Sequence, residues 1–197
     1  MVKPPGRCIF CGRHGLSKEH IWSEWTYKLV PKHPNAEREI LLIQESPISH
    51  TRSVKKHPGS SHSVRLRKVC RHHCNSGWMS GLDDATQPIL TPLILGEPTT
   101  LDVDAQQIVA AWLAMKIMVA EFSRPVDVST TQAERQFLMR ERKPPERWKI
   151  WLGQLSGEWW RTAYYRHSAT IGLASGPTPP VRPLGKNTGR SPSASEP

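Results

Sequence analysis

The chain has 197 residues, which is enough for one domain or for a small domain with an appendage. Its apolar fraction of 37% and its 18 prolines argue against one continuously packed core. Lys and Arg total 27 against 17 Asp and Glu, so the formal net charge is 27 − 17 = +10. This charge favours a polyanionic partner, because each phosphate contact releases counterions, although a basic protein with no nucleic-acid role has the same balance.

The N-terminal segment predicts no export. Residues 1–7 lack the apolar stretch of a signal peptide. The most apolar run, residues 108–115, is stopped by Lys116 and is too short to cross a bilayer. We therefore expect a cytoplasmic protein without a membrane segment. In that reducing compartment, closely spaced cysteines are more often metal ligands than disulfides.

All four cysteines lie in two close pairs, Cys8 with Cys11 and Cys70 with Cys74. The first pair has the two-residue spacing of a zinc knuckle, and Gly12 follows where such a turn needs a positive φ. Two pairs without a further thiol predict one structural zinc site with four thiolate ligands; free or redox-active thiols are the alternative. Three residues separate the second pair, so His73, which restores the two-residue spacing, is the alternative to Cys74 as the fourth ligand.

The N-terminal half predicts short elements around these pairs. Residues 17–20 are either a loop or the end of a strand, and apolar residues at helical spacing predict a short helix or turn to about residue 30. The pattern then predicts a strand over 39–44, a basic mobile loop over 46–62, and a half-buried strand with a cationic face over 64–69.

The C-terminal half is predicted to be mainly helical at first. Helices are expected over 75–94, 106–122 and 130–142, the second largely buried, with N-cap candidates at Asp102 and Asp104. Residues 148–152 and 158–174 predict a β-hairpin. Its aromatic side chains are expected in a sheet packed on helices, with a base-stacking platform as the alternative: Trp148, Trp151, Trp159, Trp160, Tyr164 and Tyr165. Residues 176–197 are expected to be a disordered tail.

Three polar residues beside the cysteines suggest phosphodiester chemistry. His20 suits a general base, because the ordinary pKa of imidazole lies near neutrality. Glu19 and Asn75 offer hard oxygen ligands for Mg²⁺ or Mn²⁺. One zinc bound to both cysteine pairs would bring these residues onto one scaffold, although they lie about 55 positions apart. Zinc would organise such a site, and a second, harder cation would take part in catalysis.

These residues resemble the HNH endonucleases, the His-Me finger family built on a ββα-metal core. The resemblance rests on Cys8-x-x-Cys11, on Glu19-His20-Ile21, and on Cys70-x-x-x-Cys74-Asn75. It implies His20 as the general base, Glu19 and Asn75 as ligands of the catalytic metal, and DNA as the substrate. The segments from Cys74 to Asp83, Trp112 to Lys116 and Trp151 to Gly153 are similar to a group of phage and bacterial HNH proteins. No asparagine lies between Asn35 and Asn75 to match the family's middle Asn. Either a backbone carbonyl takes its place or the site is impaired.

Together these observations predict an α+β fold. Residues 1–98 are expected to form a zinc-stapled treble-clef or ββα-metal nuclease core. Residues 99–175 are expected to form a helical and β-hairpin appendage packed on it, followed by the tail. The function expected first is a metal-dependent DNA endonuclease. A non-catalytic zinc module that binds nucleic acid and a protein-interaction factor are the alternatives.

Charged residues around these motifs have two interpretations. Asp83 and Asp84 are expected to be solvated helix residues rather than outer ligands of a metal. The cations that flank the motifs are candidate phosphate clamps, although a solvated strand face would have the same composition: Lys55, Lys56, Arg65, Arg67, Lys68 and Arg71.

Overall fold

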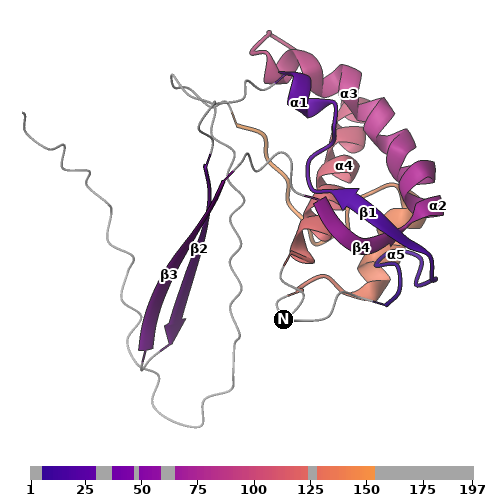
Figure 1. Ribbon diagram of the computed structural model, residues 1–197. Helices are drawn as coiled ribbons and strands as arrows, with labels where there is room; N and C mark the ends of the chain where they lie inside the picture. The colour runs from indigo at the N-terminus through magenta and orange to yellow at the C-terminus, as the bar shows by residue number, and fades with distance from the viewer. Residues whose placement is uncertain (1–5, 30–36, 47–48, 59–64, 124–127, 154–197) are drawn as a thin grey trace, which may run out of the picture. The chain divides into compact units, whose positions relative to one another are not determined.

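The computed structural model describes residues 6–29, 37–46, 49–58, 65–123 and 128–153 (Figure 1). The chain divides into two compact units, residues 1–166 and residues 167–197, and every described residue belongs to the first. The described part is a mixture of helices and two small antiparallel sheets, as the expected α+β class requires. The expected tail, 176–197, lies outside the described residues.

The N-terminal knuckle packs on the first sheet. The N–H of Cys8 donates to the Arg13 carbonyl, and the N–H of Gly12 donates to the Cys8 carbonyl, both at 2.9 Å. Gly12 has a φ of 71°, as the predicted turn requires. The N–H of Ile9 then donates to the Val69 carbonyl at 3.0 Å, which attaches the knuckle to a strand 60 positions later in the chain.

The first sheet consists of strands β1 (Leu16–His20) and β4 (Arg65–Arg71), which lie antiparallel (Figure 1). Leu16 lies opposite Arg71 and His20 lies opposite Arg65, with an irregular register between Ser17 and Glu19. The strand predicted over 64–69 is thereby confirmed, and residues 17–20 are a strand rather than a loop.

The second sheet is a hairpin of β2 (Glu37–Ser46) and β3 (Ser49–Pro58), with Glu37 opposite Pro58 and Ser46 opposite Ser49. The strand predicted over 39–44 is confirmed. The mobile loop predicted over 46–62 is wrong for residues 49–58. Their composition misled the prediction, because Val54 is the single large apolar residue among them and a strand that pairs with one neighbour needs no buried face.

A continuous helical segment follows β4. It begins with α2 (His72–Cys74), passes through the wide turn η2 (Asn75–Met79), and continues as α3 (Ser80–Ile94). Gly77, with φ −101° and ψ −111°, marks a kink in this segment. The helix predicted over 75–94 is confirmed and begins three residues earlier. The helix predicted to reach residue 30 is present only as α1 (Thr26–Leu29).

Local capping signals set the start of the two later helices. Helix α4 (Val103–Glu121) begins after Asp102, whose side chain accepts from the Ala105 N–H at 2.8 Å. Helix α5 (Gln132–Glu141) begins with a reciprocal capping box between Thr131 and Glu134. Both predicted helices and the predicted Asp102 cap are therefore confirmed.

The core is built around α4, which packs against α3, α5 and β4. The buried apolar residues form one cluster that includes Phe10, Val69, Met79, Trp112, Met115, Met118 and Leu138. By length and composition alone, α4 is long and apolar enough to cross a membrane: an 18-residue stretch of it has a mean hydropathy of 1.3, and half of that stretch is buried inside the protein. Burial to this extent is also typical of a core helix.

Residues 148–153, by contrast, form no strand, so the first strand of the C-terminal hairpin predicted over 148–152 is wrong. Trp148 packs against the core, whereas the side chain of Trp151 is 80% exposed. The aromatic and β-branched composition of the segment misled the prediction, because composition does not show that one tryptophan packs in the core while the other faces solvent. The second predicted strand, 158–174, lies outside the described residues.

Candidate functional site

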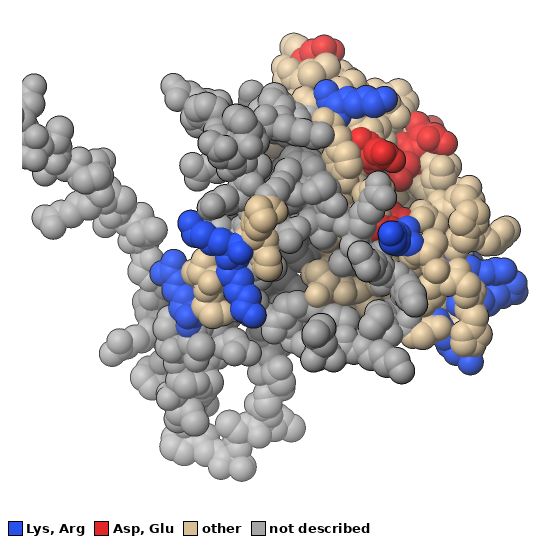
Figure 2. Space-filling view, viewed as in Figure 1, with Lys and Arg blue, Asp and Glu red and all other residues tan. Residues whose placement is uncertain are grey.

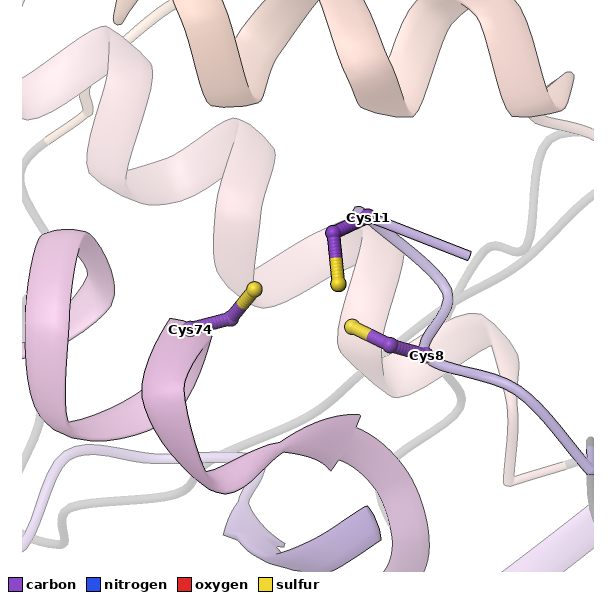
Figure 3. Close-up of side chains that lie close together, drawn as sticks. All are labelled: Cys8, Cys11 and Cys74. Atoms are coloured by element: carbon purple, nitrogen blue, oxygen red, sulfur yellow. The ribbon is translucent and has the colours of Figure 1, made fainter. Parts of the chain in front are cut away.

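Three cysteines from two distant segments meet in one cluster. Cys8 and Cys11 come from the knuckle and Cys74 comes from α2, and their sulfurs point toward one another (Figure 3). The Sγ atoms all lie within 4.8 Å of one another, with Cys8 and Cys74 buried and Cys11 half-buried. Soft thiolate ligands in this arrangement can hold a metal ion. The predicted meeting of the knuckle with the helix is therefore present for these three residues.

The pKa values of the clustered cysteines are shifted in opposite directions. Burial raises the pKa of Cys11, but the Arg13 backbone, the Cys74 and Cys8 thiols and the charge of Arg71 outweigh it, so the pKa lies below its usual value. Burial and the hydrogen bond to Cys11 raise the pKa of Cys74 to about 12. A lowered pKa favours the thiolate form, which is the form of cysteine that binds a metal ion.

Cys70 is not among the sulfurs that all lie within 4.8 Å of one another in the described part of the chain. The charges of Cys8 and Cys74 still act on its thiol, so its place as the fourth ligand stays a prediction. Cys70 is a fully buried strand residue, and burial raises the pKa of its thiol strongly. Its carbonyl accepts from the Ser17 hydroxyl at 3.1 Å, within the β1–β4 sheet. His73, the alternative ligand, is exposed and is likewise outside the cluster.

The predicted base and its neighbours lie at one end of the β1–β4 sheet. Glu19 and His20 are the last two residues of β1. The Asn75 amide donates through Nδ2 to the Lys18 carbonyl at 3.0 Å and to the Ser17 hydroxyl at 3.4 Å. The helix residue predicted to share a site with Glu19 and His20 is thus bonded to the strand that carries them.

His20 itself is half-buried at the end of its strand. Its imidazole contacts the ring of Tyr27 edge-on, with ring centroids 6.0 Å apart and planes inclined by 79°. Tyr27 belongs to α1, and its hydroxyl donates to the Trp22 carbonyl at 3.5 Å. The short helix therefore supports one side of the imidazole.

Glu19 belongs to a buried ionic network that the sequence did not reveal. Its carboxylate is paired with the Lys116 ammonium at 3.3 Å, and that ammonium also contacts Asp83 at 3.4 Å. Asp83 in turn accepts from the Trp112 indole N–H at 2.5 Å and from the Ser23 hydroxyl. Burial raises the pKa of Glu19, while the charge of Lys116 lowers it in part. The expectation that Asp83 is a solvated helix residue is therefore wrong, whereas Asp84 is exposed as expected.

A second buried network attaches α5 to the knuckle. The Arg135 Nε donates to the Ile9 carbonyl at 2.8 Å, and the Gln132 amide donates to the Phe10 carbonyl at 3.0 Å. Arg135 is 7% exposed, and it also donates to the carbonyl and hydroxyl of Thr130. The sequence carried one signal for this network, since an Arg in the middle of an amphipathic helix must find acceptors if it is buried.

Cationic side chains are exposed at several places on the described surface (Figure 2). On β3 the described side chains, residues 52–58, include three exposed cations and no carboxylate. Further exposed cations lie on the knuckle and near the end of α5. The exposed residues in these three places are Arg7, Arg13, Arg52, Lys55, Lys56, Arg140, Arg142 and Lys143.

Comparison of the chain with protein-family models, with curated proteins and with solved structures finds no match. The assignment of a function therefore depends on the geometry described above.

Proposed function

We propose that the protein is a zinc-stabilised, metal-dependent DNA endonuclease of the HNH type. The observation that carries the proposal is the bond between Asn75 and the strand of Glu19 and His20, beside a three-cysteine cluster. A knuckle, a pair of strands and a helix in this order also suit the expected treble-clef arrangement. The resemblance to HNH endonucleases supplies the roles of the three residues.

Zinc is the ion that suits the cysteine cluster best. Its ligands are soft sulfurs, one of which already has a lowered pKa, and Arg71 and Arg142 lie near enough to offset negative charge. Mg²⁺ and Mn²⁺ prefer oxygen ligands, and Glu19 and Asn75 offer a carboxylate and an amide oxygen. The NH₂ group of Asn75 donates to β1, which leaves the Oδ1 atom as the group that would coordinate a cation.

The proposed chemistry also assigns roles to His20, to the Asn75 amide group and to the exposed cations. His20 accepts a proton from water at a ring nitrogen, and the edge of Tyr27 keeps the imidazole in place. Asn75 orients β1, and exposed cations hold the flanking phosphates. A hard divalent cation, when bound, would stabilise the charge that develops on the phosphate being attacked.

The test is cleavage of supercoiled plasmid by the zinc-loaded protein in the presence of Mg²⁺ or Mn²⁺. Nicked or linear product is expected with either cation and none with a chelator present. A protein that contains zinc, is folded and binds DNA, yet yields no product with either cation, would contradict the endonuclease.

A non-catalytic zinc module that binds nucleic acid is the second candidate. The observation in its favour is the ion pair of Glu19 with Lys116, which already supplies a cation to the predicted metal ligand. This candidate predicts DNA binding in the absence of cleavage, so the plasmid experiment separates the two functions.

Both candidates predict that DNA binding weakens steeply with salt and depends little on sequence. The slope of log K against log [salt] is about −0.9 for each phosphate contact in duplex DNA. Replacing Arg52 and Lys55 by Gln should make the slope shallower by up to about twice this amount. Fluorescence anisotropy at several salt concentrations measures it, with Lys149→Gln, an exposed cation outside β3, as the matched control. A slope near zero in the wild-type protein would contradict any phosphate-binding role.

Two cysteine variants test the ligand set of the zinc. Cys74→Ser should lose most of the bound zinc, because it removes a ligand from the cluster. Cys70→Ser should lose a similar share, because its thiolate is predicted to complete the four ligands that structural zinc requires. Elemental analysis of the two purified variants, followed by competition with a chromogenic chelator, measures the loss. A Cys70 variant that retains about one zinc per chain would contradict the four-thiolate site.

A further inference from the structure

Lys116 is buried in a place where an unpaired ammonium would be costly. The residue is 5% exposed and lies on α4 beside Met115 and close to Met118, both fully buried. Burial of an isolated ammonium is unfavourable by several kcal/mol, so such a group persists only with partners. Its two partners are carboxylates that come from different elements, Glu19 on β1 and Asp83 on α3.

The Asp83 carboxylate accepts hydrogen bonds from two residues of α4. Trp112 lies four residues before Lys116, so their side chains emerge from the same face of the helix. The Trp112 indole N–H and the Lys116 ammonium both donate to Asp83, one to each oxygen. The Ser23 hydroxyl, three residues after His20, donates to the same Asp83 oxygen as the indole. Asp83 therefore holds the Lys116 ammonium through one oxygen and Ser23, just after β1, through the other.

The net charge of this network differs from that of a simple buried ion pair, which is neutral. Two carboxylates share one ammonium, so when all three groups are ionised the network retains one negative charge. The residue next to Glu19 in the chain is His20, and a carboxylate held in place fixes the end of the strand from which the imidazole projects.

We propose that Lys116 is a positioning residue for the Glu19–His20 pair, with Asp83 as its anchor; this rests on the proposed endonuclease function. Lys116 orients the Glu19 carboxylate and, through the backbone, the imidazole of His20. It does not itself contact the reacting phosphate. A displacement of about 1 Å in a reacting group can reduce the rate about 10²-fold, which sets the size of the expected effect.

The experiment compares Lys116→Met with Lys116→Arg and with a matched control, Arg135→Met. Arg135 is also a buried cation, but it binds the knuckle and Thr130 rather than Glu19. Zinc content, thermal unfolding, DNA affinity and the kinetics of plasmid cleavage are measured for each variant. Both Met variants should unfold at lower temperature. Lys116→Met alone should lose about 10²-fold in kcat with little change in KM, and Lys116→Arg should recover part of that loss.

Asp83→Asn provides a second variant if Lys116→Met does not fold, because it removes the anchoring charge and keeps an oxygen that can accept from Trp112. A loss of kcat without a change in KM is expected here too. The positioning role is wrong if the wild-type protein cleaves DNA and Lys116→Met and Asp83→Asn retain its kcat. It is also wrong if these two variants, like Arg135→Met, lose activity only in proportion to their unfolded fraction. If the wild-type protein does not cleave, the proposed function fails and the positioning role fails with it.

Discussion

His20→Ala should abolish detectable DNA cleavage while it leaves zinc content, folding and DNA affinity nearly unchanged. The residue is outside the cysteine cluster, and a neutral imidazole contributes little to phosphate attraction. Its proposed role is to accept a proton from water, and general-base catalysis is worth about 10²–10⁴-fold in rate. Cleavage of supercoiled plasmid with Mg²⁺ or Mn²⁺, followed over time for the variant and the wild type, measures this loss.

The matched control is His14→Ala, because His14 is an exposed histidine of the knuckle and has no proposed catalytic role. Glu19→Ala should lose activity as well, but excess Mn²⁺ should restore part of it, because the proposed defect is a missing ligand. Excess Mn²⁺ should not restore His20→Ala. A His20 variant that cuts as fast as the wild type would refute the assignment of the base, even for a protein that is a nuclease.

Removal of zinc should unfold at least residues 8–95. Structural zinc sites contribute about 10–16 kcal/mol at neutral pH, while whole domains are stable by only about 5–15 kcal/mol. The cluster ties the knuckle to α2, and Ile9 and Phe10 between its first two cysteines are buried core residues. Loss of the ion would leave three thiols to hold this junction. Circular dichroism during titration with a strong chelator, with zinc readdition as the reversal, measures the transition.

Elemental analysis of the same samples is the control, since unfolding should follow the loss of the ion and not the chelator concentration. A reduced, folded protein that contains no tightly bound metal would contradict the zinc assignment. Retention of the full circular dichroism signal after the metal is gone would show that the hydrophobic core suffices without the cluster.

Elements with a local signal were predicted well. Helices α4 and α5 have caps at Asp102 and Thr131 that can be recognised within four residues of sequence. The cysteine spacing also predicted that the knuckle would meet Cys74. Strand β3 was missed because it is polar along its length, so neither alternation nor apolar content distinguishes it from a loop.

Contacts between distant residues were predicted less well. Lys116 and Glu19 are 97 positions apart, and no periodicity relates them. A single lysine within the apolar run of α4, residues 108–120, was the available signal, because such a residue must find an anion if the helix is buried. The role of Cys70 stays a prediction. Its spacing from Cys74 suggests a fourth ligand, and its fully buried thiol on β4 is not among the sulfurs that lie within 4.8 Å of one another.

The attachment of α5 to the knuckle has a consequence for the order of events during synthesis. Cys8, Cys11 and Cys74 are all made long before Gln132 and Arg135, the donors to the carbonyls of Phe10 and Ile9. We therefore expect the nascent chain to bring its cysteines together before their surroundings are complete, with α5 closing over the knuckle last. A chain that terminates after α4 lacks both donors, which leaves two carbonyls of the knuckle to water.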